Sequence, residues 1–230
     1  MSSSLSIQRL ELLLRQLGNL SDELVFVGGA VIELYLDRLP EQPIRPTKDV
    51  DCIVSTASRS QYQKIEEQLY KRGFSNAGFT EANSPICRYK FADLILDVMP
   101  SDEAALGFTN RWFKFALQAP IDASLPSGQK IRLPSWACFF AIKLEAMIGR
   151  GGDDLRSSQD LEDIIVLLDG ATNSVEQIGQ APEAVRSFVI ETIRQLLHSA
   201  DFRECVEACA PAGFTQAERI LAQLYIISKR

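Results

Sequence analysis

The chain alternates short apolar runs with longer segments in which apolar residues recur every three or four positions. The short runs are typical of buried strands, and the longer spacing is typical of helices that bury one face. In the first half, helices are predicted over residues 5–18, 30–39, 58–71 and 110–118. Strands are predicted over residues 24–27, 50–54, 86–91, 94–99, 121–125 and 130–133.

The pattern changes at Pro134. After this residue nearly every segment has helical spacing, and glycine and charged residues interrupt it over 149–154. Helices are predicted over about 135–149, 157–168, 182–200, 201–209 and 215–228. We therefore expect residues 1–134 to form a domain of strands and helices, and residues 135–230 to form a helical domain.

Three aspartates interrupt this apolar pattern. Asp49 and Asp51 alternate at the start of the strand predicted over 50–54, and Asp97 lies within the apolar strand 94–99. Residues two apart on a strand point to the same face, so Asp49 and Asp51 should project together. If Asp97 lies on a neighbouring strand, three carboxylates converge. Such oxygen ligands suit a hard divalent cation such as Mg²⁺ and indicate phosphoryl or nucleotidyl transfer.

Structural explanations for the aspartates stay open at this point. Asp49 and Asp51 could occupy a solvent-facing strand edge, although aspartate is unfavourable in strands and like charges on one face repel. Asp97 could pair with Arg88 or Lys90 instead of a metal, because an unpaired charge within a buried strand is costly.

A glycine pair, Gly28-Gly29, follows the apolar strand 24–27 and precedes the aspartates. Glycine lets the backbone turn sharply and lets a phosphate approach main-chain N–H groups. The start of the helix expected next adds the positive end of its dipole. A plain turn is the alternative explanation for the pair.

A single lysine, Lys143, lies in the otherwise apolar helix predicted over 135–149. Its ammonium could neutralise a triphosphate, extend to solvent, or form an ion pair with Asp160 or Asp163. These two aspartates are three residues apart and share a helix face, which could also simply be solvated. The sequence leaves these alternatives open.

Composition and charge narrow the function classes. The 230 residues are 46% hydrophobic and 23% charged, which is typical of one or two globular domains. The net charge of −6 argues against sequence-independent nucleic-acid binding over the whole surface. A local basic surface stays open and would use Arg45, Lys48, Arg88, Lys90, Arg111 and Lys114. The nearby aromatic residues could stack on bases or pack in the core: Trp112, Phe113 and Phe115.

Cysteine and histidine usage excludes several further classes. The five cysteines show no CxxC pairing, and Cys52 and Cys138 lie in apolar runs as expected of core residues. Because no secretory signal is visible, the odd cysteine count fits a cytoplasmic protein. The single histidine, His198, argues against a histidine-rich zinc site and against a serine triad. No apolar run in the sequence is long enough to span a membrane.

In combination, these motifs resemble those of a known superfamily. The order Gly28-Gly29, Asp49-x-Asp51 and Asp97 resembles the nucleotidyltransferase superfamily with a DNA polymerase β-like palm. Two later segments, 141–150 with its terminal Arg150 and 159–164, are similar to the bacterial AbiEii-type group. That group consists of nucleotidyltransferase-like toxins of toxin–antitoxin and phage-defence systems. The resemblance covers about residues 24–170.

The resemblance implies a fold and residue roles. The fold would be α+β, with a nucleotidyltransferase-like mixed sheet flanked by helices and followed by a helical C-terminal domain. Asp49, Asp51 and Asp97 would be catalytic and would bind Mg²⁺ or Mn²⁺, with Asp97 helping to activate the attacking hydroxyl. Nucleotide-binding roles would fall to Gly28, Gly29, Lys143 and Asp160.

The implied reaction moves a nucleoside monophosphate from an NTP such as ATP to a hydroxyl. The acceptor would be RNA (tRNA in the toxin-like role), a protein or a small molecule, and an antitoxin protein would be a partner. The chain departs from the family pattern at Gln159, where a basic residue is frequent, and in a longer, proline-rich loop between Gly29 and Asp49. The alternatives are a non-catalytic nucleotide- or partner-binding module that keeps the fold, and a phosphohydrolase or nuclease with the same metal site.

Overall fold

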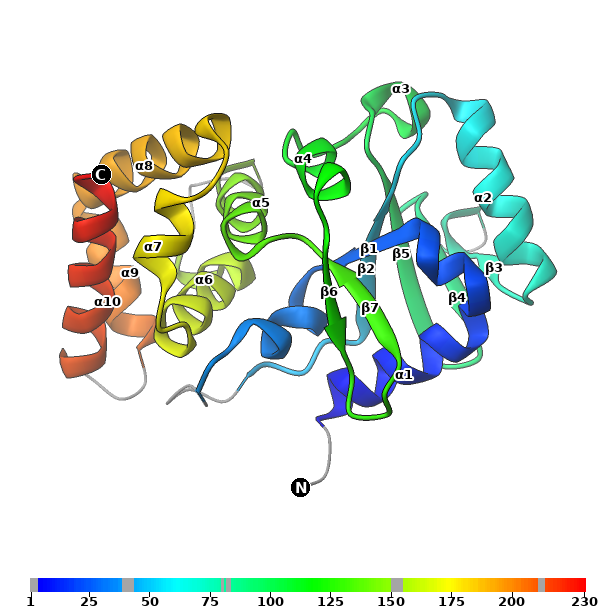
Figure 1. Cartoon of the computed structure of the whole chain (residues 1–230), viewed down its shortest axis with the longest axis horizontal. Coiled ribbons are helices and arrows are strands. Elements are labelled where there is room, and N and C mark those ends of the chain that lie inside the picture. The colour runs from blue at the N-terminus through cyan, green and yellow to red at the C-terminus, as the bar shows by residue number, and fades with distance from the viewer. Residues whose placement is uncertain (1–3, 39–43, 80, 82–83, 150–154, 211–213) are drawn as a thin grey trace. The chain divides into compact units, whose positions relative to one another are not determined.

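The computed structural model of the chain is drawn in Figure 1. The described residues are 4–38, 44–79, 81, 84–149, 155–210 and 214–230. They form two compact units, which we call the sheet unit (residues 1–31 and 45–135) and the helical unit (residues 32–44 and 136–230). The division after residue 135 is adjacent to the expected boundary at 134. The described part of 32–44, expected from the sequence in the first domain, instead groups with the helices.

A mixed five-stranded sheet forms the centre of the sheet unit. Its strands, in spatial order, are β1 (Leu24–Val27), β2 (Asp49–Val54), β5 (Leu94–Pro100), β4 (Arg88–Phe91) and β3 (Ser75–Asn76). The β2–β5 pair is parallel, and the other pairs are antiparallel. This mixed sheet, followed in the chain by a helical region, confirms the expected α+β class.

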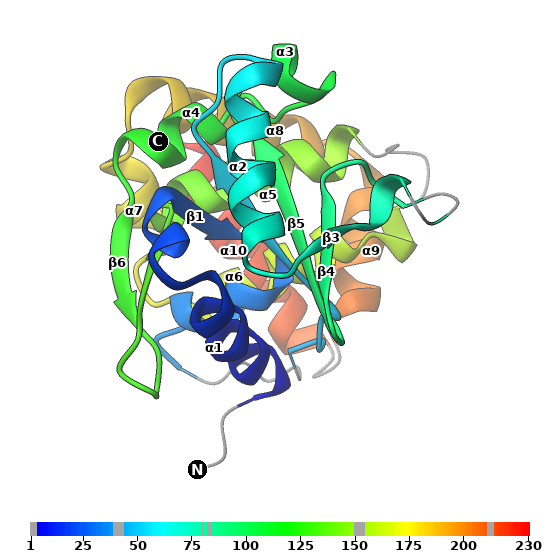
Figure 2. The same cartoon turned by 90° about the vertical axis from the view of Figure 1, so that its right-hand side faces the viewer.

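Helices and one hairpin complete the sheet unit. The helices are α1 (Leu5–Leu17), α2 (Arg59–Lys71), α3 (Glu103–Leu106) and α4 (Phe113–Gln118), with 3₁₀ turns at Gly18–Glu23 and Ala77–Phe79. A further 3₁₀ helix, Gly29–Tyr35, begins in this unit and ends in the helical unit. The hairpin consists of β6 (Ile121–Ser124) and β7 (Lys130–Leu133). Figure 2 shows α1 and α2 crossing one face of the sheet.

Local sequence explains why α1 and α2 begin where they do. Ser4 and Ser58 are the N-cap residues, and each hydroxyl oxygen accepts a hydrogen bond from the backbone three residues later. Tyr62 on α2 is buried and donates its hydroxyl proton to the carbonyl of Val98 at 2.7 Å. This contact fixes α2 to β5, the strand that carries Asp97.

The helical unit contains most of the remaining elements. They are α5 (Trp136–Gly149), a 3₁₀ turn (Leu155–Ser157), α6 (Gln159–Gly170), α7 (Ser174–Gly179), α8 (Glu183–Leu197), α9 (Ala200–Cys209) and α10 (Phe214–Ser228). Helix α5 is surrounded by other residues, since every residue from Trp136 to Leu144 is buried. The predicted helices of this half are therefore present, with α7 added.

One predicted helix is wrong. Residues 30–39 are expected to form a helix, but the structure has a 3₁₀ helix over Gly29–Tyr35. The backbone N–H groups of Asp37 and Arg38 donate to the carbonyl of Gly170, at 3.0 and 3.3 Å, instead of continuing a helical ladder. The sequence also gave no indication of α3, α7 or the short strand β3. The expected roles of Pro40, Pro43 and Arg150, and the break over 150–154, lie outside the described residues.

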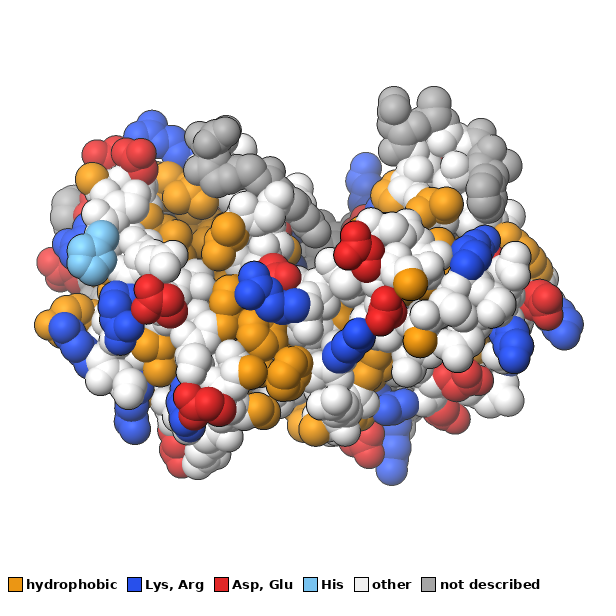
Figure 3. Space-filling view, turned by 90° about the horizontal axis from the view of Figure 1, so that it is seen from above, with side chains coloured by type: hydrophobic (Ala, Val, Ile, Leu, Met, Phe, Trp, Pro, Cys, Tyr) orange, Lys and Arg blue, Asp and Glu red, His pale blue; other side chains and the backbone are white. Residues whose placement is uncertain are grey.

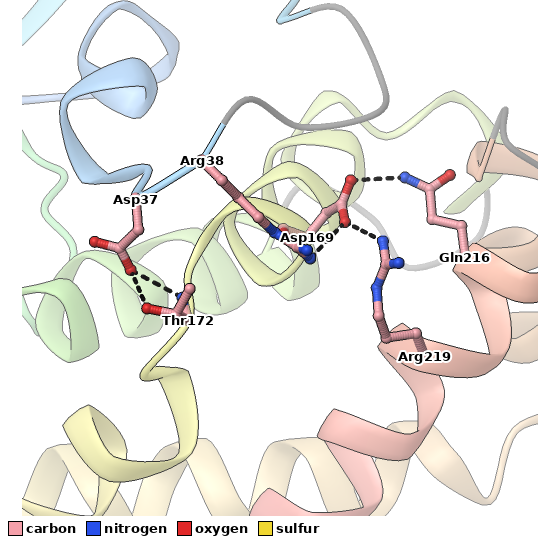
Figure 4. Close-up of polar contacts among 6 residues, drawn as sticks. All are labelled: Asp37, Arg38, Asp169, Thr172, Gln216 and Arg219. Atoms are coloured by element: carbon pink, nitrogen blue, oxygen red, sulfur yellow. Dashed lines mark hydrogen bonds and ion pairs between the residues drawn. The ribbon is translucent and has the colours of Figure 1, made fainter.

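Residues 35–38 are anchored on the helical unit, which explains why they group with it. The Tyr35 ring stacks on Phe139 with centroids 4.6 Å apart. Asp37 accepts hydrogen bonds from the backbone and the hydroxyl of Thr172, at 2.9 and 2.7 Å (Figure 4). Arg38 donates to the carbonyl of Asp169 at 2.6 and 2.9 Å.

Asp169 is the buried centre of this anchor (Figure 4). Its side chain is 1% exposed and bonds to Gln216 at 2.9 Å, to Arg38 at 3.3 Å and to Arg219. Since a buried carboxyl group is costly unless it is paired and hydrogen-bonded, these partners offset the cost of burying Asp169. The network ties the segment after β1 to α6 and α10.

Three further expectations are confirmed by burial or placement. Cys52 and Cys138 are buried in the core, as predicted. His198 is exposed at the C-terminal end of α8, with Nδ1 2.6 Å from the carbonyl of Arg194. In the described part of the chain, no helix combines the length and apolar character needed to cross a membrane.

Asp169→Asn is expected to lower the free energy of unfolding by about 1–3 kcal/mol, because it removes the charge that two arginines and an amide share. Arg38 and Arg219 stay 49% and 34% exposed, so water limits the loss below that of a fully buried pair. Chemical denaturation measures the change. The control Glu207→Gln removes an exposed charge on α9 and should change stability by less than about 0.5 kcal/mol. Equal effects of the two variants would contradict this role for Asp169.

Candidate functional site

Strand register brings the three aspartates to one face of the sheet. Asp51 on β2 lies directly opposite Asp97 on the parallel neighbour β5, and Asp49 is two residues before Asp51 on the same strand. Partners in register, and residues two apart, share a face of the sheet. Asp97 is buried, whereas Asp49 and Asp51 are half-buried. The sequence could not have supplied this register, because it depends on contacts between distant segments.

Arg88 on β4 joins two of these carboxylates. Its Nε donates to Asp97 Oδ1 at 2.8 Å, and its Nη2 donates to Asp97 Oδ2 at 2.7 Å. The same Nη2 donates to Asp49 Oδ2 at 2.8 Å. The hydrogen bonds to Asp97, and then its charge and that of Asp49, raise the pKa of Arg88 above its ordinary value. The ion pair that the sequence left open for Asp97 is therefore present, with Arg88 and not with Lys90.

The glycine turn lies against Asp51. Gly28 has φ +76°, a conformation that side chains rarely adopt, and a Cβ there would lie 1.9 Å from Asp51 Oδ2. A Cβ on Gly29 would lie 2.4 Å from Cγ2 of Thr47 and 3.8 Å from the Arg45 guanidinium. Both glycines are therefore required by close packing, and Gly28 is required because the Asp51 carboxylate occupies the space beside it.

The donor chemistry of this face fits a hard cation. The guanidinium of Arg88 already lies as a cation between Asp49 and Asp97, so this face stabilises positive charge. Among the described residues, however, no group of three or more Asp, Glu, His or Cys side chains is arranged to hold a metal ion. Three carboxylates on one face are the ligands that Mg²⁺ or Mn²⁺ prefers, but the present arrangement serves Arg88.

The negative charge of the site contributes to the raised pKa values of two buried thiols. Burial, and then the carboxylates of Asp97 and Asp51, raise the pKa of Cys87 to about 12. Burial first, and then the same two carboxylates, also raise the pKa of Cys52. Both thiols therefore stay protonated at neutral pH, which argues against a nucleophilic role for either cysteine.

Lys143 and Asp160 lie together within the helical unit. The Lys143 ammonium is 3.2 Å from Asp160 Oδ1 and 2.6 Å from Asp163 Oδ2, and all three side chains are at most 8% exposed. Of the alternatives that the sequence left open for Lys143, the structure contains the ion pair. A contact of Lys143 or Asp160 with nucleotide phosphates stays a prediction.

Three of the six residues of the candidate basic surface pair with acidic side chains. Besides Arg88, Lys90 pairs with Glu81 at 2.5 Å, and Lys114 pairs with Asp102 at 2.8 Å. On the face drawn in Figure 3, basic and acidic side chains of the described residues are interspersed and not segregated. The aromatic residues Trp112 and Phe113 are buried, so they pack in the core instead of presenting a stacking surface.

A polar groove of about 770 Å³ lies elsewhere in the sheet unit. Its lining includes Thr56 and Ser101, which follow the C-terminal ends of β2 and β5, together with Lys64 on α2. The aspartates lie toward the opposite end of β2, and none of them lines this groove. The groove therefore does not contribute to the candidate site.

Comparison with protein-family models gives no match, and comparison with the curated proteins gives none. Among solved structures, the chain is similar to the antibiotic-resistance factor ANT(2'')-Ia, whose solution structure reveals substrate-regulated conformation dynamics. The TM-score is 0.47 at 15% sequence identity, over 81% of this chain and 94% of that one. A likeness of this size carries no functional argument, so the functional proposal rests on the residues themselves.

Gly28→Ala is expected to displace the Asp51 carboxylate and to lower the free energy of unfolding by about 2 kcal/mol or more. Gly107→Ala is a matched control, because Gly107 has φ +82° and nothing lies within 4 Å of its added Cβ. It carries only the cost of the positive φ, about 1 kcal/mol. Chemical denaturation of both variants measures the difference. Equal losses would mean that the close approach of Gly28 to Asp51 is unimportant.

Lys143→Met is expected to lower the free energy of unfolding by about 3–5 kcal/mol, since it removes the ammonium that is paired with two buried carboxylates. Lys64→Met, at an exposed lysine of α2, should change stability by less than about 0.5 kcal/mol. Thermal and chemical denaturation compare the two variants. Full stability of Lys143→Met would show that the buried ion pair contributes little to folding.

Proposed function

We propose that the chain is a metal-dependent nucleotidyltransferase that moves a nucleoside monophosphate from an NTP to a hydroxyl acceptor. The observation that carries this proposal is the common face of Asp49, Asp51 and Asp97, set by the β2–β5 register beside the glycine turn. Three carboxylates next to a glycine turn are the kind of ligand set that suits a metal-bound polyphosphate.

The residues of the sheet unit take the following roles in this proposal. Gly28 and Gly29 bind the triphosphate through main-chain N–H groups of the turn, beside the Asp51 carboxylate, which occupies the space where a Cβ of Gly28 would lie. Asp49, Asp51 and Asp97 hold Mg²⁺ or Mn²⁺, which when bound lowers the pKa of the acceptor hydroxyl and stabilises charge on the phosphates. The acceptor oxygen forms a bond to the α-phosphorus as the bond to the β-phosphate oxygen breaks, and pyrophosphate leaves. In this proposal Asp97 helps to accept the hydroxyl proton.

The roles proposed for Lys143 and Asp160 must be reconciled with their buried ion pair. Lys143 contacts nucleotide phosphates and Asp160 lies beside it, as in the family that the sequence resembles. The same lysine compensates two buried aspartates, so any phosphate contact must leave those carboxylates satisfied. In this proposal residues 1–134 carry the transfer chemistry, and residues 135–230 form the accompanying helical domain.

The acceptor and the cellular role rest on the resemblance alone. A toxin-like protein of the cytoplasm would modify tRNA or a protein and would be restrained by an antitoxin protein.

The second candidate function is a non-catalytic nucleotide- or partner-binding module. The observation that favours it is the bidentate pairing of Arg88 with Asp97, which supplies a protein cation where catalysis needs a metal. Such a module would bind nucleotide without transferring any part of it.

Asp51→Asn is expected to reduce transfer of an α-³²P-labelled nucleotide to acceptor by about 100-fold or more, because a carboxylate that would hold the phosphate-stabilising metal is lost. Asp122→Asn, at an exposed residue of β6, should leave transfer unchanged. The assay uses Mg²⁺ or Mn²⁺ and each of the four NTPs, with RNA and protein acceptors.

Product analysis separates the candidate functions. Pyrophosphate released in proportion to labelled acceptor supports nucleotidyl transfer, whereas free phosphate or cleaved strands indicate a phosphohydrolase or nuclease. Nucleotide binding without labelling, in wild type and in Asp51→Asn, would reject the enzyme in favour of the binding module.

A further inference from the structure

The guanidinium of Arg88 occupies the space between two carboxylates assigned above to a metal. Its Nη2 lies 2.7 Å from Asp97 Oδ2 and 2.8 Å from Asp49 Oδ2, so a single nitrogen bridges them. An ion coordinated by the same two oxygens would have to stand where this nitrogen stands. Guanidinium and metal therefore exclude each other at this position.

The geometry and burial of the Arg88–Asp97 ion pair make it stronger than an ordinary surface pair. Arg88 presents Nε and Nη2 to both oxygens of Asp97, the planar two-bond geometry in which arginine binds carboxylates best. The Asp97 and Arg88 side chains are only 10% and 23% exposed, so solvent screens this pair less than a surface pair.

We propose that Arg88 is an internal counter-cation that holds Asp49 and Asp97 in the metal-free protein and that is displaced when a divalent cation binds. This inference rests on the proposed function, because it takes these aspartates as metal ligands. It adds that the metal site is not preformed but is created by exchange of one cation for another. The free energy of breaking the Arg88 pairs then opposes metal binding.

The alternative is that Arg88 positions the carboxylates for the metal and so assists binding. The two possibilities predict opposite signs. If Arg88 competes, its removal tightens metal binding. If Arg88 positions the aspartates, its removal lets them move apart and weakens binding.

The first test measures Mn²⁺ affinity of the full chain by calorimetry and by the electron paramagnetic resonance signal of free Mn²⁺. For Arg88→Gln we expect binding tighter by roughly tenfold, the scale of one lost charge-assisted pair. Lys90→Gln is the matched control: Lys90 lies on the same strand, pairs with Glu81 and carries the same charge. Lys90→Gln should change the Mn²⁺ affinity by less than about twofold, since it alters the net charge of the protein without removing a partner of Asp49 or Asp97.

Weaker or unchanged Mn²⁺ binding by Arg88→Gln, relative to Lys90→Gln, would overturn the proposal. Asp49→Asn in the Arg88→Gln background should abolish the gain; a gain that persists would mean that the ion binds elsewhere, which also overturns it. Circular dichroism and thermal unfolding check that each variant is folded.

A second test uses the wild-type chain, so it does not depend on whether Arg88→Gln folds. The Arg88 Nε–H bonds to Asp97 Oδ1 at 2.8 Å and should be protected from exchange with water. Because the guanidinium is rigid and planar, Nη2 cannot leave the two aspartates while this bond stays unchanged. In ¹⁵N-arginine-labelled protein, with the signal assigned by Arg88→Lys, saturating Mg²⁺ should shift the Nε–H resonance and remove its protection. An unchanged resonance at Mg²⁺ saturation would overturn the proposal.

These tests separate the inference from the proposed function. Tighter Mn²⁺ binding by Arg88→Gln without any nucleotidyl transfer would support the counter-cation and reject the enzyme. Transfer by the wild type without a gain in affinity on removing Arg88 would support the enzyme and reject the counter-cation.

Discussion

The parallel pairing of β2 with β5 is the constraint on which the site depends. It sets Asp51 opposite Asp97, although like charges in register repel. Neither strand can relieve the repulsion by slipping one residue, because a slip would move buried side chains such as Cys52 and Val98 to the other face. The apolar face of the sheet therefore holds the carboxylates together, and the resulting negative charge makes the opposite face favourable for a cation.

Two local features make this arrangement tolerable. Arg88 supplies a cation from the next strand, at the position opposite Asp97, so the same sheet that creates the repulsion also carries its compensation. Gly28 leaves room for the Asp51 carboxylate at the end of β1, where any side chain would collide with it. Both features depend on sheet register, because Asp51 lies opposite Val27, the residue before Gly28.

What could be predicted from the sequence was local. The apolar spacing of α1 and α2 and the alternation of Asp49 with Asp51 each depend on neighbouring residues. The sequence left Arg88 and Lys90 open as partners of Asp97, and only the β4–β5 register, which sets Arg88 opposite Asp97 and Lys90 opposite Ile95, decides between them. The helix expected over 30–39 was wrong because the contacts that decide its path, with Phe139, Gly170 and Thr172, lie over a hundred residues away.

The exposure of the ion-pair network sets the side from which a second cation can compete. The Asp97 side chain is 10% exposed and holds Arg88 through two bonds, whereas Asp49 is 36% exposed and holds it through one. Water and salt screen the Asp49 contact more strongly, so it is the weaker link. If a divalent cation displaces Arg88 as proposed, it would therefore gain an oxygen of Asp49 before it competes for Asp97. If Asp97 were the more exposed of the two, the guanidinium would be held by two bonds at the solvent-facing side of the site. A cation arriving from solvent would then have to break the stronger pair first.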